Sequence, residues 1–266
     1  NYYALILAEY IAGSEEEFVK RMNAKAMDLG LKNTKFQNCT GLPTSDHYSS
    51  AYDMAMMAKE LLKHEEITKF TSLYESYLRE DTDKKFWLVN TNKLVKFYPG
   101  VDGLKTGFTH EAKYCLTATA KKDNLRVIAV VFGAENPKER NTQVTQMLDY
   151  AFANYQARPV YKKNQPLALL KIEKGQKKKV SLVTSDTVSL LNKKGEDNVN
   201  IRPNIELQKD VQAPIKKGEQ LGTLKMIKDD KVISETPLIA SKDVKRASWF
   251  DLYKRAFGMF THVDSE

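Results

Sequence analysis

The sequence has 266 residues, enough for one large domain or two ordinary ones. Its hydrophobic content of 42% and charged content of 29% are typical of a soluble globular protein, and no apolar run is long enough to span a membrane. The two cysteines lack C-x-x-C spacing and the four histidines lack ligand spacing, which argues against a disulfide framework and a zinc site. We therefore expect no bound metal.

The positive charge is unevenly distributed along the chain. Residues 1–157 hold 20 basic and 20 acidic side chains, whereas residues 158–266 hold 22 basic and 14 acidic ones. This shift predicts a domain boundary near residue 157. A basic second part could face nucleic acid or an anionic membrane. We expect no nucleic-acid partner, because the sequence contains no recognition-helix, zinc-finger or aromatic RNP pattern.

The first 64 residues predict three helices. Apolar residues recur at helical spacing over residues 2–12, and Gly13 ends that segment. Ser14 with the glutamates that follow it forms a capping box for a second helix, which closes at Gly30. Ser50 caps a third helix, which runs to about residue 64.

From Thr71 the hydrophobic period changes to two, which predicts strands. We place these at Ser72–Arg79, Phe86–Val89 and Gly103–Thr109, with a hairpin formed by Tyr114–Lys121 and Leu125–Ala134. Pro137 then lies in the first turn of a helix that runs to about residue 155. An antiparallel sheet between helices indicates an α+β fold.

The strand at residues 103–109 carries the tripeptide Lys105-Thr106-Gly107. A lysine on such a strand can direct its ammonium group into a cleft, and Gly107 leaves room for a substrate backbone beside the strand. The tripeptide alone fits a solvated strand end equally well.

Other motifs accompany this tripeptide, and Lys-Thr-Gly is a signature of serine β-lactamases and penicillin-binding proteins. They are Leu7-Ala8-Glu9-Tyr10, Thr40-Gly41-Leu42-Pro43, His47-Tyr48-Ser49-Ser50-Ala51-Tyr52-Asp53, Asn90-Thr91-Asn92 and Tyr98-Pro99-Gly100-Val101-Asp102-Gly103. With them the sequence resembles the low-molecular-mass penicillin-binding proteins that are D-alanyl-D-alanine carboxypeptidases. The resemblance covers most of the first 156 residues and continues more weakly to the C-terminus. It implies an incomplete transpeptidase domain of the penicillin-binding-protein and β-lactamase type over residues 1–157.

The resemblance also implies a reaction. In that family a serine attacks the carbonyl between the two D-alanines of the peptidoglycan pentapeptide, and β-lactam antibiotics acylate the same serine. Lys105 would bind the terminal carboxylate, to which Thr106 and Thr109 would offer hydroxyls. The N–H of Phe108 would be one oxyanion donor, and Asn1 would contact the amide on the acyl side. The chemistry requires no cofactor.

One feature departs from the family pattern. The sequence contains no Ser-x-x-Lys, and alignment on the first helix places Asn1 at the asparagine of the family's Ser-x-Asn triplet, whose serine is absent. We expect an N-terminal part to be missing, and this chain alone to be inactive. Two other functions stay open: a serine β-lactamase, or a non-catalytic truncated fragment that binds the wall or the membrane.

Short strands between turn signals follow residue 158. We expect them at Ala168–Ile172, Lys179–Val183, Val188–Leu191, Asn200–Leu207, Gln220–Ile227 and Lys231–Pro237. They predict a small all-β sandwich over residues 158–243. It contains no constellation of acid, base and nucleophile, and the resemblance implies that this part is a β-rich stalk.

The last segment predicts an amphipathic helix over residues 244–266. Trp249, Tyr253, Ala256 and Phe260 recur at helical spacing, with Phe250 and Phe257 beside them, and Lys245, Arg246, Lys254 and Arg255 add positive charge. We expect Trp249, Tyr253, Phe257 and Phe260 to be the anchor residues. This pattern is typical of a helix at an anionic membrane surface, although a helix docked on its own domain shows it as well. The resemblance implies the first: a protein outside the cytoplasm, held peripherally on the outer face of the bacterial cytoplasmic membrane.

Overall fold

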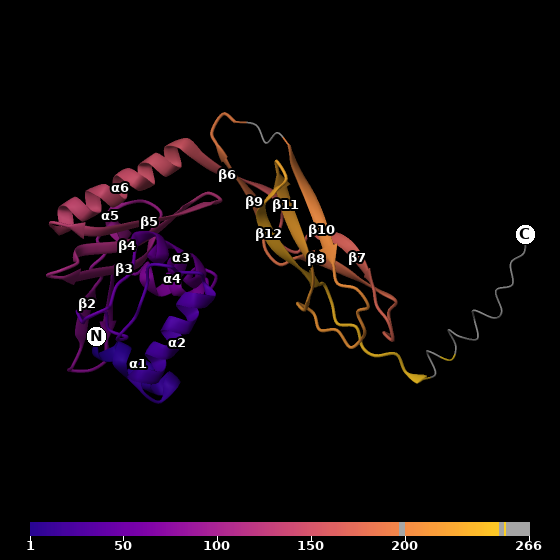
Figure 1. Ribbon diagram of the computed structural model, residues 1–266, viewed down its shortest axis with the longest axis horizontal. Helices are drawn as coiled ribbons and strands as arrows, with labels where there is room; N and C mark the ends of the chain where they lie inside the picture. The colour runs from indigo at the N-terminus through magenta and orange to yellow at the C-terminus, as the bar shows by residue number, and fades with distance from the viewer. Residues whose placement is uncertain (197–199, 250–252, 254–266) are drawn as a thin grey trace, which may run out of the picture. The chain divides into compact units, whose positions relative to one another are not determined.

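The computed structural model describes residues 1–196, 200–249 and 253, and the chain divides into two compact units, Asn1–Asn154 and Tyr155–Glu266 (Figure 1). The division falls three residues before the predicted boundary. Strand β6 (Tyr155–Tyr161) begins directly after helix α6 (Pro137–Asn154) and pairs with β9 (Val188–Lys193). Residues 155–157 carry no charge, so the charge counts of the two parts are unchanged.

The helices of unit 1 form where local signals place them. They are α1 (Tyr2–Ala12), α2 (Glu15–Asp28), α3 (Ala51–Leu61) and α4 (Glu66–Thr71). Gly13 ends α1 at a φ of 86°, a conformation that glycine adopts without strain. Ser14 Oγ accepts the N–H of Glu17 at 3.2 Å, and Ser50 Oγ accepts that of Asp53 at 3.1 Å. The predicted caps are therefore confirmed.

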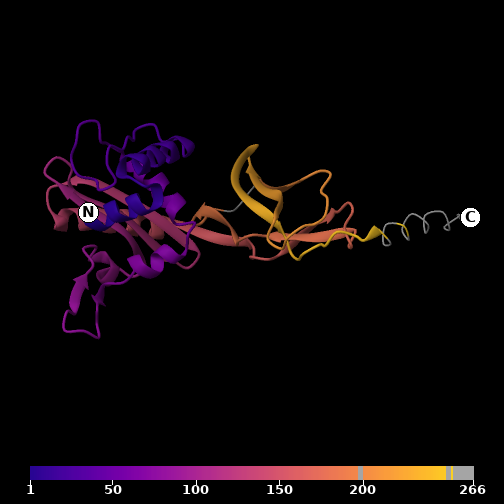
Figure 2. The same cartoon turned by 90° about the horizontal axis from the view of Figure 1, so that it is seen from below.

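A three-stranded antiparallel sheet forms the centre of unit 1. Its order is β3 (Val101–Thr109), β4 (Lys113–Lys122) and β5 (Leu125–Ala134). Helix α6 and the short α5 (Leu94–Phe97) pack on one face through a core that includes Leu116, Val144 and Leu148. Figure 1 shows α3 and α4 on the other side of the sheet. The hairpin of β1 (Glu75–Leu78) and β2 (Phe86–Val89) extends away from this sheet (Figure 2).

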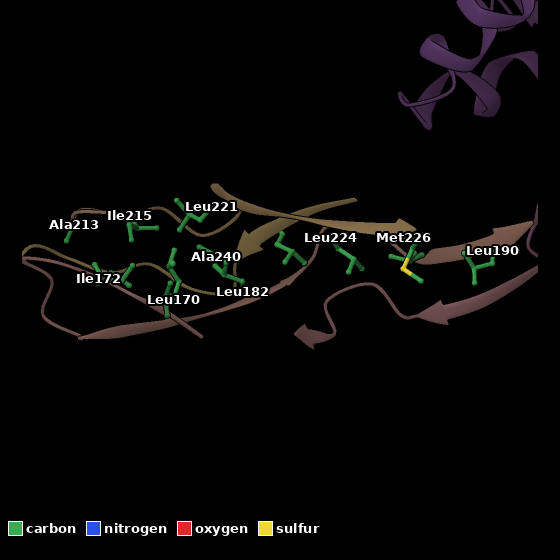
Figure 3. Close-up of a cluster of buried hydrophobic side chains, with 14 residues drawn as sticks. Leu170, Ile172, Leu182, Leu190, Ala213, Ile215, Leu221, Leu224, Met226 and Ala240 are labelled. Carbon is green, nitrogen blue, oxygen red and sulfur yellow. The ribbon is translucent and has the colours of Figure 1, made fainter. Parts of the chain in front are cut away.

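Unit 2 contains two antiparallel sheets around one core, which confirms the predicted all-β domain. The larger sheet has the order β10-β11-β12-β8-β7, and β6 pairs with β9. The remaining strands are β7 (Pro166–Lys171), β8 (Lys179–Thr184), β10 (Ile201–Leu207), β11 (Gln220–Lys228) and β12 (Lys231–Ala240). Figure 3 shows the core as an elongated row, with Ile172, Ala213 and Ile215 at one end and Met226 and Leu190 toward the other.

Two elements of unit 2 differ from the sequence prediction. Strand β6 was not predicted, since the first strand expected after residue 158 was Ala168–Ile172. The strand tolerates Pro159 beside a register shift between Pro159 and Tyr161. The predicted helix does not begin at Val244. Val244 is 1% exposed, its N–H and C=O both bond to Ile215, and Ala247 donates to the carbonyl of Lys174. Burial in the β core keeps this segment extended.

Candidate functional site

Strand β3 lies at the edge of its sheet, because β4 alone pairs with it among the described strands. Its register with β4 is regular from Gly103 to Thr109, so successive side chains point to alternate faces. Within Lys105-Thr106-Gly107-Phe108-Thr109, the lysine, the glycine and the last threonine share one face. The other two residues lie on the opposite face, where Leu116, the partner of Thr106, is fully buried.

Side chains from other elements hold the first residues of β3. Thr71 Oγ1 donates to the carbonyl of Asp102 at 2.6 Å, and Nδ2 of the buried Asn92 donates to that of Gly103 at 3.0 Å. A Cβ at Gly103 would lie 2.7 Å from Thr71 Oγ1, so this approach requires glycine. Both carboxylate oxygens of Asp102 accept from Arg126 at 2.8 Å. The strand is thus fixed at its start and open from Lys105 onward.

Lys105 is exposed, and its Nζ donates to the carbonyl of Thr106 at 2.6 Å. The hydroxyl of Thr106 lies 2.7 Å from that of Thr91, which precedes the buried Asn92. Thr106 is therefore engaged on the face opposite Lys105 and is not directed with it toward one ligand. The contact between Thr91 and Thr106 was missed from the sequence, where Asn90-Thr91-Asn92 contributed to the resemblance without a role.

Gly107 and Thr109 lie on the same face as Lys105. A Cβ at Gly107 would meet only Cys115 Cβ, at 3.9 Å, so the fold would accept a side chain there. The glycine instead leaves the outer side of the strand clear. Thr109 Oγ1 accepts the N–H of Ala112 at 2.9 Å, and its own proton can be donated to an anion.

The side chain of Phe108 points away from this face. Its ring is 51% exposed and lies 4.4 Å from the ring of Tyr114, its cross-strand partner. His110 contacts the same ring edge to face, at 5.7 Å. Of Phe108, only the backbone N–H belongs to the predicted site.

Three of the other predicted site residues, Asn1, Trp249 and Tyr253, belong to the described structure. Asn1 is exposed at the start of α1, and its carbonyl accepts the N–H groups of Ala4 and Leu5. Its side chain makes no capping hydrogen bond. Trp249 is 76% and Tyr253 49% exposed, and their rings stack at 5.4 Å. The predicted anchor residues Phe257 and Phe260 lie outside the described residues.

A polar cavity of about 490 Å³ lies beside the turn that follows β3. It is lined by residues 43–48 and by Glu111, which belongs to that turn. His47 Nδ1 accepts the N–H of Gln37 at 3.0 Å, which places the proton of the neutral ring on Nε2. Burial lowers the pKa of His47, which favours this neutral form. The cavity therefore combines two carboxylates, Asp46 and Glu111, with imidazole and hydroxyl groups, an arrangement not predicted from the sequence.

The described residues contain no group of three or more histidine, cysteine, aspartate or glutamate side chains that could hold a metal ion. The site residues are a lysine, threonines and backbone groups. These groups are suited to binding an anionic ligand rather than to metal coordination.

The comparisons with known proteins agree in both units. Residues 1–136 match the family D-alanyl-D-alanine carboxypeptidase, and residues 155–246 match the C-terminal domain of penicillin-binding protein 5. Penicillin-binding protein 5 from Haemophilus influenzae is 30% identical, with a TM-score of 0.61 over 91% of this chain and 70% of its own. Penicillin-binding protein D2 from Listeria monocytogenes, in its cefotaxime-bound form, is 33% identical, with a TM-score of 0.50 over 56% of this chain and 60% of its own.

The fold and the placement of Lys-Thr-Gly on an edge strand thus define a protein of the penicillin-binding class. The D-alanyl-D-alanine carboxypeptidase DacF from Bacillus subtilis is 60% identical over 98% of this chain and 67% of its own length. The chain belongs to the D-alanyl-D-alanine carboxypeptidase family, which confirms the resemblance. It spans about two thirds of the length of these relatives. Membership in this enzyme family favours a carboxypeptidase over a β-lactamase.

Proposed function

We propose that this chain forms the substrate-carboxylate side of a serine-type D-alanyl-D-alanine carboxypeptidase, which removes the terminal D-alanine from peptidoglycan pentapeptides and binds β-lactams. The observation that carries the proposal is the shared face of Lys105, Gly107 and Thr109 on an open edge strand. The cefotaxime-bound relative supports the β-lactam part.

The geometry supports specific roles on this face. An extended peptide can add to the open edge of β3, with its backbone passing close to Gly107. Lys105 supplies a cation and Thr109 a hydroxyl proton to the carboxylate of the terminal D-alanine, and the N–H of Phe108 acts as one oxyanion donor. Thr106, bonded to Thr91, orients the strand and does not contact the substrate. Asn1 retains the predicted contact with the acyl-side amide.

The acylation rate tests this assignment. The chain is joined to the family's Ser-x-x-Lys segment, and fluorescent penicillin and release of D-alanine report on the site. Lys105→Ala should cost about 1.5–3 kcal/mol of transition-state stabilisation, because a charge-assisted contact is lost. Lys231→Ala, an exposed strand lysine in unit 2, is the matched control. Equal rates for the wild type and Lys105→Ala would refute the role of Lys105.

We further propose that the protein lies outside the cytoplasm, peripherally on the outer face of the cytoplasmic membrane. In this arrangement unit 2 serves as a stalk, and Trp249, Tyr253, Phe257 and Phe260 bind the lipid interface. The exposed, stacked rings of Trp249 and Tyr253 support this, because indole and phenol rings favour the boundary between headgroups and acyl chains. In the part of the chain that the structure describes, no helix is long and apolar enough to cross a bilayer.

Sedimentation with vesicles tests the membrane placement. The chain should sediment with vesicles that contain phosphatidylglycerol, and Trp249→Ser together with Tyr253→Ser should weaken binding at least tenfold, since two aromatic side chains no longer enter the interface. Tyr77→Ser, at an exposed aromatic position in unit 1, is the control. Undiminished vesicle binding by the double variant would show that Trp249 and Tyr253 do not anchor the protein.

A further inference from the structure

The excess positive charge of unit 2 is concentrated at one end of its core. Three segments meet there, residues 173–179, 209–219 and 242–247, which we call the basic tip. Together they hold ten basic and four acidic residues, of the 22 basic and 14 acidic residues that follow residue 154. Most of the net charge of unit 2 therefore lies in these segments.

Backbone hydrogen bonds join the three segments into one surface. Glu173 donates to the carbonyl of Val211 at 2.9 Å, and Gln176 donates to that of Lys245 at 2.8 Å. Lys217 N–H donates to Asp243 Oδ1 at 2.7 Å. Figure 3 shows Ile172, Ala213 and Ile215, which adjoin or belong to these segments, together at one end of the core. The tip is thus a surface held by the fold.

The cations of the tip are available to an external anion. All ten are exposed: Lys174, Lys177, Lys178, Lys179, Lys209, Lys216, Lys217, Lys242, Lys245 and Arg246. No ion pair joins any of them to an acid among the described residues. Two of the four local carboxylates accept backbone N–H groups, Asp243 from Lys217 and Glu219 from Lys216.

The basic tip is continuous with the proposed anchor. Ala247 donates to the carbonyl of Lys174 at 2.7 Å, and the exposed Trp249 follows two residues later. Lys245 and Arg246 are held in the extended segment of the tip, so they are not part of an amphipathic helix. Aromatic rings beside a cationic surface match the two components of a lipid interface, the acyl boundary and the anionic headgroups.

We propose that the basic tip is a second membrane contact, which binds the anionic headgroups of phospholipids while the aromatic tail enters the interface. This rests on the proposed membrane placement and adds to it a surface of the folded domain. One anchoring element alone binds a bilayer reversibly, and a polybasic surface is a known kind of second element. The tip would bring the end of unit 2 against the lipid surface.

The test uses the whole chain and vesicles of phosphatidylcholine with or without phosphatidylglycerol. The tip variant combines Lys177→Gln, Lys216→Gln and Lys242→Gln, one from each segment. The control variant combines Lys193→Gln, Lys228→Gln and Lys231→Gln, which removes the same charge from exposed residues outside the tip. Lys193 and Lys228 follow Leu190 and Met226, which lie toward the other end of the core, and Lys231 pairs with Lys228. Thermal unfolding of both variants verifies that the fold is retained.

The tip variant should bind phosphatidylglycerol vesicles at least tenfold more weakly at about 0.1 M salt, and the control should lose less than threefold. High salt should remove the difference between the two variants.

Equal losses of binding in the tip and control variants would overturn the inference, because net charge would then explain the binding. Full binding of the tip variant, with binding lost only on Trp249→Ser and Tyr253→Ser, would overturn it while leaving the proposed anchor intact. Failure of the wild-type chain to bind phosphatidylglycerol vesicles would refute both proposals. Tip-dependent binding to soluble poly(glycerol phosphate) alone would show that the partner is a wall polymer and not the lipid.

Discussion

The two units of this chain use lysine in opposite ways. Unit 1 balances 20 basic against 20 acidic residues and exposes Lys105 on one face of an open strand beside Gly107 and Thr109. Unit 2 carries the whole charge excess, and most of it lies in the exposed cations of the basic tip. A single oriented cation suits recognition of one carboxylate, whereas a field of cations suits an extended anionic surface.

The largest effect is expected from the core of unit 2. Leu182 is fully buried in β8, so Leu182→Ala should lower the free energy of unfolding of unit 2 by about 2–5 kcal/mol. Leu191→Ala, at a position 62% exposed, is the matched control. Urea unfolding measures both. Penicillin acylation should be unaffected by Leu182→Ala, and a parallel loss of acylation would show that the two units are not independent.

The next effect concerns the start of β3. Asn92→Ala leaves the buried carbonyl of Gly103 and the N–H of Leu94 without their partner, which should destabilise unit 1 by about 1–3 kcal/mol. Asn204→Ala, at an exposed position in β10, should change little. Urea unfolding followed by fluorescence measures the change. An unchanged free energy of unfolding for Asn92→Ala would mean that this side-chain amide does not hold the start of β3.

Substitutions at two strand glycines distinguish an effect on substrate approach from an effect on packing. Gly107→Ala should leave stability unchanged but slow acylation about tenfold, or ~1.4 kcal/mol, because the methyl group narrows the edge of β3. Gly222→Ala should destabilise unit 2 and leave acylation unchanged, since its Cβ would lie 2.8 Å from the carbonyl oxygen of Glu206 in β10. Stopped-flow acylation and thermal unfolding report the two outcomes. Unchanged acylation of Gly107→Ala would mean that no substrate backbone passes there.

The smallest effect is a pH dependence confined to unit 1. Burial lowers the pKa of His47 below its ordinary value of 6.5. Between pH 6.5 and that lower value the unfolded chain binds the additional proton, so the stability contributed by neutral His47 is complete above pH 6.5 and decreases as the pH falls. His47→Gln should flatten this slope, whereas His64→Gln at an exposed position should not. Unfolding midpoints of unit 1 measured across this range test the assignment.

The sequence by itself determined the features that depend on neighbouring residues. Ser14 and Ser50 cap their helices through N–H groups three residues away, and Lys122-Asp123-Asn124 closes the hairpin of β4 and β5. The alternation around Lys105 predicted β3, and the surrounding motifs were specific enough to predict the family. These signals are local, so they can be read without knowledge of the packing.

Tertiary structure decided what depends on partners far along the chain. Thr106 is turned from the face of Lys105 because β4 sets the register, and its hydroxyl meets Thr91 from another segment. Tyr155–Tyr161 becomes a strand because Val188–Lys193 pairs with it. The predicted helix was placed from Val244 onward, yet the burial of Val244 and its bonds to Ile215 keep this residue extended. Helical spacing is a local property, but burial of an apolar side chain in a distant core outweighs a weak helix preference, and only the fold shows which one prevails.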